Sequence, residues 1–208
     1  MTDPLPHPVL LRAGDLPVTR AGGRTVRRIA AGPDGAWLLS LLDLERPGTL
    51  PAAAGAERVL TVVDGELLVL GTGGREQALE RHRPFRGPAD EPVDVALPTG
   101  PVRALEVLAP REAVRAHVVV LELSPKRPHP VFADQLAVLL SGRAVLTAGG
   151  AAEQSTETAP GETTARTTGR TTEDVGVLDT VRGGEPDAPE LTGRGFLAVV
   201  SLDPPVQD

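Results

Sequence analysis

The sequence has no cysteine and no tyrosine, and aromatic residues make up only 2% of its 208 residues. Without cysteine there is no disulfide, no thiolate nucleophile and no thiolate metal site. The few aromatic side chains, Trp37, Phe85, Phe132 and Phe196, cannot form the stacking surface that binds single-stranded nucleic acid. The formal net charge of −7 also disfavours a nucleic-acid partner, because such binding relies on cationic side chains that displace counterions.

Long apolar runs are also missing. No stretch approaches the roughly 18 apolar residues that a membrane span needs, so we expect no membrane partner. The first residues, MTDPLPHPVLLRAGD, contain neither a basic segment nor an apolar core of the signal-peptide type. The expected location is therefore cytoplasmic.

Short apolar segments recur along the whole chain, separated by many of the 23 glycines and 21 prolines. Most of these segments are five to eight residues long and rich in valine, as in 37–44, 58–63, 102–108, 117–123 and 196–202. This spacing predicts an all-β sandwich or barrel. Only 75–82 and 111–116 have a helical pattern, each long enough for a turn or two.

Two segments are similar to each other and indicate an internal duplication. In each, an apolar strand leads into a turn that ends in glycine, at Asp64-Gly65 and at Ser141-Gly142, and a second apolar strand follows. Such turns are typical of β-hairpins, because glycine accepts a positive φ. We therefore predict two related β modules, residues 1–112 and 113–208, with a threonine-rich loop at 155–172 in the second.

An arginine-rich strand is the strongest candidate for a binding site. In 25–30, Thr25, Arg27 and Ile29 alternate with Val26, Arg28 and Ala30, so one arginine must face the interior if the strand is central. A buried guanidinium needs a carboxylate partner. This partner is either internal, with Glu57 and Glu106 as the candidates, or an acidic ligand that Arg27 holds with the help of Arg20.

Several motifs in the first half resemble the HutD/Ves family. That family's opening pattern, Trp-Lys-Asn-Gly-Gly-Gly-x-Thr-Arg-Glu-Ile, is similar to the region around RAGGRTVRRI at 20–29, which places two of its glycines on Gly22 and Gly23. A strand with a tryptophan follows at Trp37, and Glu57-Arg58 stands where the family has Asp-Arg. A Pro-Phe segment lies at 84–85. The resemblance covers about residues 8–110.

The chain departs from the family pattern mainly at polar positions. Thr19, Arg20 and Ala21 replace the Trp-Lys-Asn that precedes the glycines, and Arg28 replaces the glutamate. The resemblance further implies an Asp-x-Asn element where this chain has Ala104 and Glu106. The scaffold signature is thus better preserved than the site signature, as in a divergent member.

Histidine is too scarce for a typical cupin metal site. Such a site needs two histidines on alternate positions of one strand, whereas His7, His82, His117 and His129 lie in separate segments. No Gly-x-Ser-x-Gly elbow or phosphate-binding loop is present either. We therefore expect no metal, no cofactor and no catalytic residue.

The resemblance implies two fused cupin-like barrels of the RmlC-like jelly-roll type. It also implies a metal-independent bicupin that binds a small acidic metabolite such as formylglutamate and regulates histidine utilisation. The alternatives are a metal-independent isomerase or hydrolase with Glu57 or Glu106 as general base, and a scaffold without a ligand site. Exposed sheet edges would allow a homodimer. The predicted ligand-binding residues are Arg27, Arg20, Glu57, Arg58, Glu106 and Trp37.

Overall fold

Antiparallel strands make up nearly all of the regular structure. The computed structural model describes residues 9–150 and 169–204. Within these ranges there is no α-helix, and the helical turns are two short 3-10 segments, Ala13–Asp15 and Pro33–Gly35. The all-β prediction is confirmed. None of the described segments forms a helix that is both long and apolar enough to cross a membrane.

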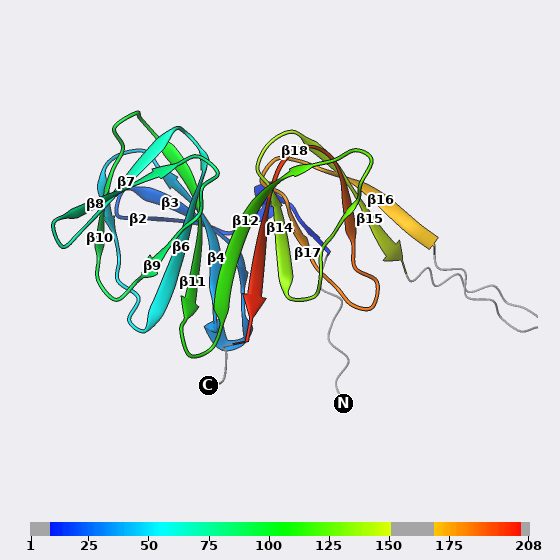
Figure 1. Cartoon of the computed structure of the whole chain (residues 1–208), viewed down its shortest axis with the longest axis horizontal. Coiled ribbons are helices and arrows are strands. Elements are labelled where there is room, and N and C mark those ends of the chain that lie inside the picture. Colours follow the sequence, from blue (N-terminus) through cyan, green and yellow to red (C-terminus); the bar gives the residue numbers. More distant parts are fainter. Residues whose placement is uncertain (1–8, 151–168, 205–208) are drawn as a thin grey trace, which may run out of the picture.

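Two facing sheets form the first half of the molecule (Figure 1). The larger sheet has six strands in the order β2 (Val18–Ala21), β3 (Arg24–Ala31), β4 (Leu38–Leu44), β11 (Val102–Pro110), β6 (Ala56–Asp64) and β9 (Phe85–Pro88). The smaller sheet has the order β5 (Gly48–Leu50), β10 (Val93–Ala96), β7 (Leu67–Thr72) and β8 (Arg75–Glu80). Buried leucines and valines from both sheets meet between them, and we call this cluster the first core.

A third, eight-stranded sheet builds the second half. Its path runs β1 (Leu10–Leu11), β17 (Thr180–Arg182), β14 (Gln135–Leu139), β18 (Glu190–Asp203), β15 (Arg143–Gly150) and β16 (Gly169–Val175), while β12 (Arg115–Leu123) and β13 (His129–Pro130) also pair with β18. One part of β18 pairs with β15 and the other with β12 and β14. The sheet thereby folds over its own apolar cluster, the second core.

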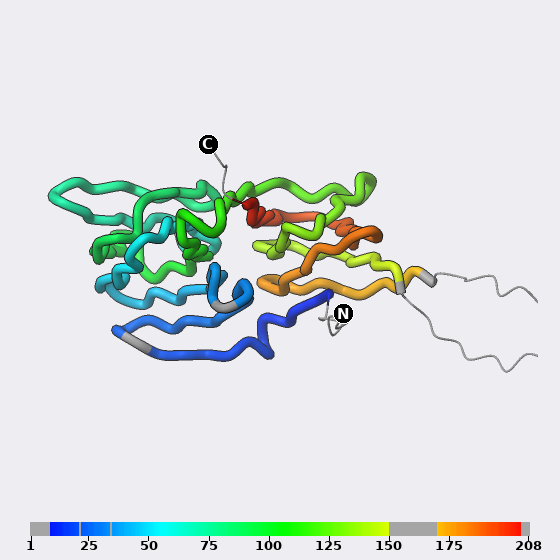
Figure 2. Tube along the Cα trace, turned by 90° about the horizontal axis from the view of Figure 1, so that it is seen from below, coloured from blue at the N-terminus to red at the C-terminus, as the bar shows by residue number. Residues whose placement is uncertain are grey.

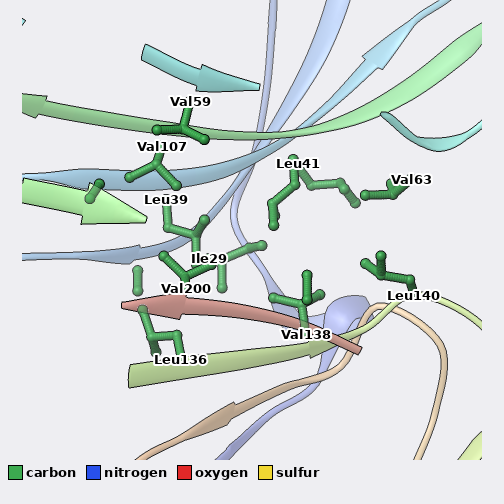
Figure 3. Packing of buried hydrophobic residues seen from close by; sticks show 14 of the residues in the cluster. Ile29, Leu39, Leu41, Val59, Val63, Val107, Leu136, Val138, Leu140 and Val200 are labelled. Atoms are coloured by element: carbon green, nitrogen blue, oxygen red, sulfur yellow. The ribbon is translucent and has the colours of Figure 1, made fainter. Parts of the chain in front are cut away.

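A central core joins the two halves (Figure 3). Leu39 and Val107 from the six-stranded sheet pack with Leu136, Val138 and Val200 from the eight-stranded sheet. All five are at most 3% exposed. The six-stranded sheet is therefore covered by apolar side chains on both faces, which explains why β4 and β6 have nearly continuous apolar sequences.

Strand β1 lies in the second half, although the predicted division placed it in the first. Leu10 and Leu11 pair with Val181 and Thr180 of β17, and Figure 2 shows the blue segment beside the orange one. Arg12 then donates to the buried Asp179 at 2.8 Å. The connection between β11 and β12, at residues 111–114, coincides with the predicted division, but 10–11 belong to the sheet of the other half.

Several local predictions need correction. Residues 75–80 form strand β8 rather than helix, because they pair along their whole length with β7. Of the predicted threonine-rich loop, 155–168 lie outside the described residues, and 169–172 are part of β16. In the region 111–116, a turn leads into β12.

The two glycine turns have the predicted backbone but not the predicted strand pairing. Gly65 and Gly142 have φ of +87° and +88°. However, β6 pairs with β11 and β9, whereas β7 pairs with β10 and β8, so the first turn links two facing sheets. The turn at Gly142 likewise joins β14 to β15, which do not pair with each other. At each turn, the strands before and after it pair with other strands of the sheets and not with each other.

Candidate functional site

The predicted site residues lie on two opposite faces of the six-stranded sheet. Glu106 stands opposite Leu60, which belongs to the first core, so Glu106 faces the four-stranded sheet. Arg27 stands opposite Leu41, which belongs to the central core. Residues paired across a sheet share a face, so Arg27 and Glu106 point away from each other. The six predicted residues therefore do not converge on one site.

On the inner face, Arg58 and Glu106 form a buried ion pair. The Arg58 side chain is 2% exposed and the Glu106 side chain 11%. The guanidinium Nε donates to Glu106 Oε1 at 2.8 Å, and Nη2 donates to the Pro51 carbonyl oxygen at 2.6 Å. Nη1 is buried with no partner among the described residues. Burial raises the pKa of Glu106, and the nearby Arg58 charge opposes that rise.

On the opposite face, Arg27 is bound by Asp43. The same carboxylate also pairs with Arg103, so one acid lies between two arginines. The prediction named Glu57 and Glu106 as internal partners of Arg27, and this was wrong. Glu106 faces the other way, and Glu57 shares the face of Arg27 but lies on β6, which β4 and β11 separate from β3. Asp43 lies on the same face of the adjoining strand β4 as Arg27. The Arg27 side chain is half-buried rather than enclosed, with 28% of its surface exposed.

Two of the other predicted residues, Glu57 and Trp37, make structural contacts. Glu57 pairs with Arg86 of β9 at the sheet edge. Trp37 packs partly buried against the central core, and its ring lies so close to Gly32 that an added Cβ there would stand 2.6 Å from the indole nitrogen. Neither residue lines the clefts described next.

A cationic cleft surrounds the turn between β2 and β3. It is an open cleft with a volume of about 300 Å³, lined by Arg20, Gly22, Gly23, Arg24, Thr25, Glu45 and Arg46. The positive φ of the two glycines, +60° and +77°, forms the tight turn. Arg46 lies directly over Gly23, because a Cβ placed there would be 2.7 Å from the guanidinium Nε. We call this the arginine cleft.

The charges of the arginine cleft are unbalanced. Among the described residues, no carboxylate lies within salt-bridge distance of Arg20, Arg24 or Arg46. Arg24 is fixed by donating to the Thr49 carbonyl oxygen at 3.1 Å. A second cleft of about 410 Å³ adjoins it and shares Arg20, Thr25 and Glu45; it extends to the ion pair of Arg27. The predicted ligand-binding residues include Arg20 but not Arg24 or Arg46, and no local pattern distinguishes Arg46.

The histidines are scattered in the structure as they are in the sequence. His7 lies outside the described residues. The His82 ring packs at a tilt against the Phe196 ring, with the ring centroids 4.8 Å apart. Burial and the neighbouring Arg81 lower the pKa of His82. Within residues 9–150 and 169–204, no three metal-ligating side chains gather into a potential metal site.

Comparison with known proteins establishes the family. Residues 20–180 match the HutD family model. The chain belongs to the HutD family. The resemblance deduced from the glycine turn and the Glu57-Arg58 pair is thereby confirmed.

Two kinds of relatives illustrate this membership. Protein Ves of Cronobacter sakazakii is 31% identical over 108 residues, which are 50% of this chain and 60% of that protein. The HutD structure from Pseudomonas fluorescens SBW25 superposes with a TM-score of 0.68 at 22% identity, covering 95% of this chain and 98% of that one. A conserved protein of unknown function from Pseudomonas aeruginosa PAO1 gives a TM-score of 0.70 at 21% identity, over 94% and 97%. These structures share the cupin-like jelly-roll fold with this HutD-family chain.

Proposed function

We propose that this HutD-family protein binds a small carboxylate metabolite without a metal, and that the carboxylate binds in the arginine cleft. The observation that carries the proposal is the set of three arginines, Arg20, Arg24 and Arg46, that line one cleft without a carboxylate partner among the described residues. Guanidinium groups bind carboxylates through paired, charge-assisted hydrogen bonds. The absence of a Cβ at Gly23 lets the Arg46 guanidinium lie directly over the turn, beside the other arginines of the cleft.

We place the ligand at the rim of the barrel because the barrel interior is filled. The interior of the first half is filled by buried leucines such as Leu42, Leu60 and Leu68, each at most 1% exposed. Arg27 contributes through the adjoining cleft, where its bond to Asp43 limits what it can offer an acid. Arg20 lines both clefts and is the expected main contact.

We further propose that each half is one cupin-like barrel, so that the chain is a bicupin. Each half has its own apolar core. The turns at Gly65 and Gly142 occupy corresponding places, since each follows a strand that pairs with a long central strand, β11 or β18, and leads into a strand with which it does not pair. This repetition supports the internal duplication.

The biological part of the proposal rests on the family. The resemblance to HutD and Ves suggests a formylglutamate-like ligand and regulation of histidine utilisation. The rival hypothesis of a carboxylate general base receives less support, because Glu57 is paired with Arg86 and Glu106 with Arg58. A base that must accept a proton is disfavoured by a neighbouring cation.

Isothermal titration calorimetry tests the proposal. The probes are formylglutamate, glutamate and formate, titrated into the wild-type chain and into Arg20→Ala and Arg46→Ala. Loss of one charge-assisted contact should weaken binding by about tenfold or more. Arg83→Ala is the matched control, because that arginine is 79% exposed and remote in sequence from the cleft. The proposal is wrong if no probe binds the wild type, or if the cleft variants bind as tightly as the control.

A further inference from the structure

A charged group with an unused donor lies deep in the first half, separate from the arginine cleft. The Arg58 side chain is 98% buried, and its Nη1 has no partner among the described residues. Its surroundings are apolar: Leu60 of the same strand is fully buried, and Leu50 precedes the residue whose carbonyl oxygen accepts from Nη2. A buried guanidinium in such a place requires an anion, because it cannot lose its proton.

Among the described residues, one carboxylate of the chain, that of Glu106, is bonded to Arg58. Glu106 reaches it with a single oxygen, Oε1, which accepts from Nε. A carboxylate that matched the guanidinium fork would accept from two nitrogens. Glu106 thus neutralises the charge of Arg58 but leaves part of the hydrogen-bonding capacity of the guanidinium unused. Its side chain also keeps 11% of its surface exposed, so the pair is not fully enclosed.

We propose that Arg58 is the centre of an interior anion site for small monocarboxylates, and that Glu106 occupies this site as an internal substitute for the ligand. The site therefore stays closed to external acids while Glu106 is in place. Removing that side chain opens it, and a carboxylate of acetate size then binds at Arg58. The inference is independent of the arginine cleft, which lies at the β2–β3 turn and contains neither residue.

The variant Glu106→Ala tests this inference, because it removes a methylene and a carboxylate, which together have the composition of acetate. Its thermal unfolding is measured in sodium acetate and in sodium chloride of equal ionic strength. We expect a lowered midpoint in chloride and a rise of several degrees in acetate, saturating with concentration. The wild type, in which Glu106 fills the site, gives the rise that acetate causes elsewhere on the chain, and the rise in Glu106→Ala should exceed it by several degrees.

Two further variants make the result specific. The double variant Arg58→Leu/Glu106→Ala lacks the cation and should not respond to acetate. Glu57→Ala, which frees Arg86 outside both clefts, is the matched control for a general arginine effect and should respond weakly at most. If Glu106→Ala does not fold in chloride, its refolding yield with acetate replaces the midpoint.

The inference is overturned if acetate leaves Glu106→Ala unchanged or unfolded. It is equally overturned if the double variant or Glu57→Ala gains as much as Glu106→Ala. Each rise is taken relative to the wild type, which has the same Arg20 and Arg46, so the proposed function and this inference can fail separately.

Discussion

The buried pair of Arg58 and Glu106 gives an asymmetric prediction about stability. We consider Arg58→Met, Glu106→Leu and the double variant, in which apolar side chains replace one or both charges. Each single variant leaves the other charged group in an apolar interior, where the two are now bonded at 2.8 Å. The double variant leaves none.

The magnitudes follow from charge and burial. Opposite charges about 4 Å apart attract by about 4 kcal/mol at an effective dielectric constant of about 20. Breaking a buried pair by removing one partner lowers the free energy of unfolding by about 3–5 kcal/mol, and we expect Glu106→Leu to lie in this range. Arg58→Met should lose only about 1–3 kcal/mol, because the remaining carboxyl can take up a proton and become neutral.

The pH dependence of Arg58→Met has a definite sign. Burial already raises the pKa of Glu106, and removing the cation raises it further. A carboxyl whose pKa is higher in the folded than in the unfolded state binds more protons when folded. The variant should therefore be most stable relative to wild type at acid pH and lose stability as pH rises through the raised pKa. Glu106→Leu should show no such loss, since arginine does not titrate in this range.

Urea unfolding at about pH 5 and about pH 7 measures these differences. The double variant should be less destabilised than the sum of the single variants by at least about 2 kcal/mol. The exposed pair of Glu57 and Arg86 is the control, and its cycle should give at most about 1 kcal/mol. Additive effects at Arg58 and Glu106, within about 0.5 kcal/mol, would refute the reasoning that the two charges are coupled in the interior.

Three further perturbations test the fold. Gly142→Ala should lower stability by more than about 2 kcal/mol in urea unfolding, because its Cβ would stand 1.9 Å from a carbonyl oxygen at a φ of +88°. The control Gly35→Ala has open space at a similar φ and should lose about 1 kcal/mol; equal losses would contradict the clash. Leu39→Ala should cost about 2–5 kcal/mol and keep one cooperative transition, because the central core joins both halves; two separate transitions would contradict this. An arginine partner lowers the pKa of Asp90 to about 2, so its contribution to stability should be lost as pH falls from about 4 toward 2. Asp90→Asn should lack that part of the acid transition in circular dichroism, and an unchanged curve would contradict it.

Much of the fold could be predicted because strand signals are local. Apolar runs such as 102–108 and 58–63 are strands with nearly the predicted bounds, since burial on both faces makes the whole run apolar. Short edge strands such as β9 (85–88) and β5 (48–50) were missed, because they bury few side chains. Strand β8 was taken for a helix, because its residues are good helix formers and only pairing with β7 decides the outcome.

The candidate site was harder to predict, because the alternation of side chains along a strand tells which residues share a face of the sheet but not which of them form ion pairs. The sequence required a partner for an arginine of the strand 25–30 and named Glu57 and Glu106 as the internal candidates. In the structure Asp43 pairs with Arg27, whereas Glu106 pairs with Arg58. Choosing between them needed the register of β11 against both β4 and β6, which no local pattern contains.

The pairing of β1 with β17 has a consequence for how the molecule is made. Leu10 and Leu11 leave the ribosome long before Val181 and Thr180, the residues with which they pair. During synthesis β1 therefore has no partner strand until residues 180–181 have been made. A deletion of Leu10 and Leu11 should remove an edge strand from the sheet of the second half, although these residues are among the earliest to be synthesised.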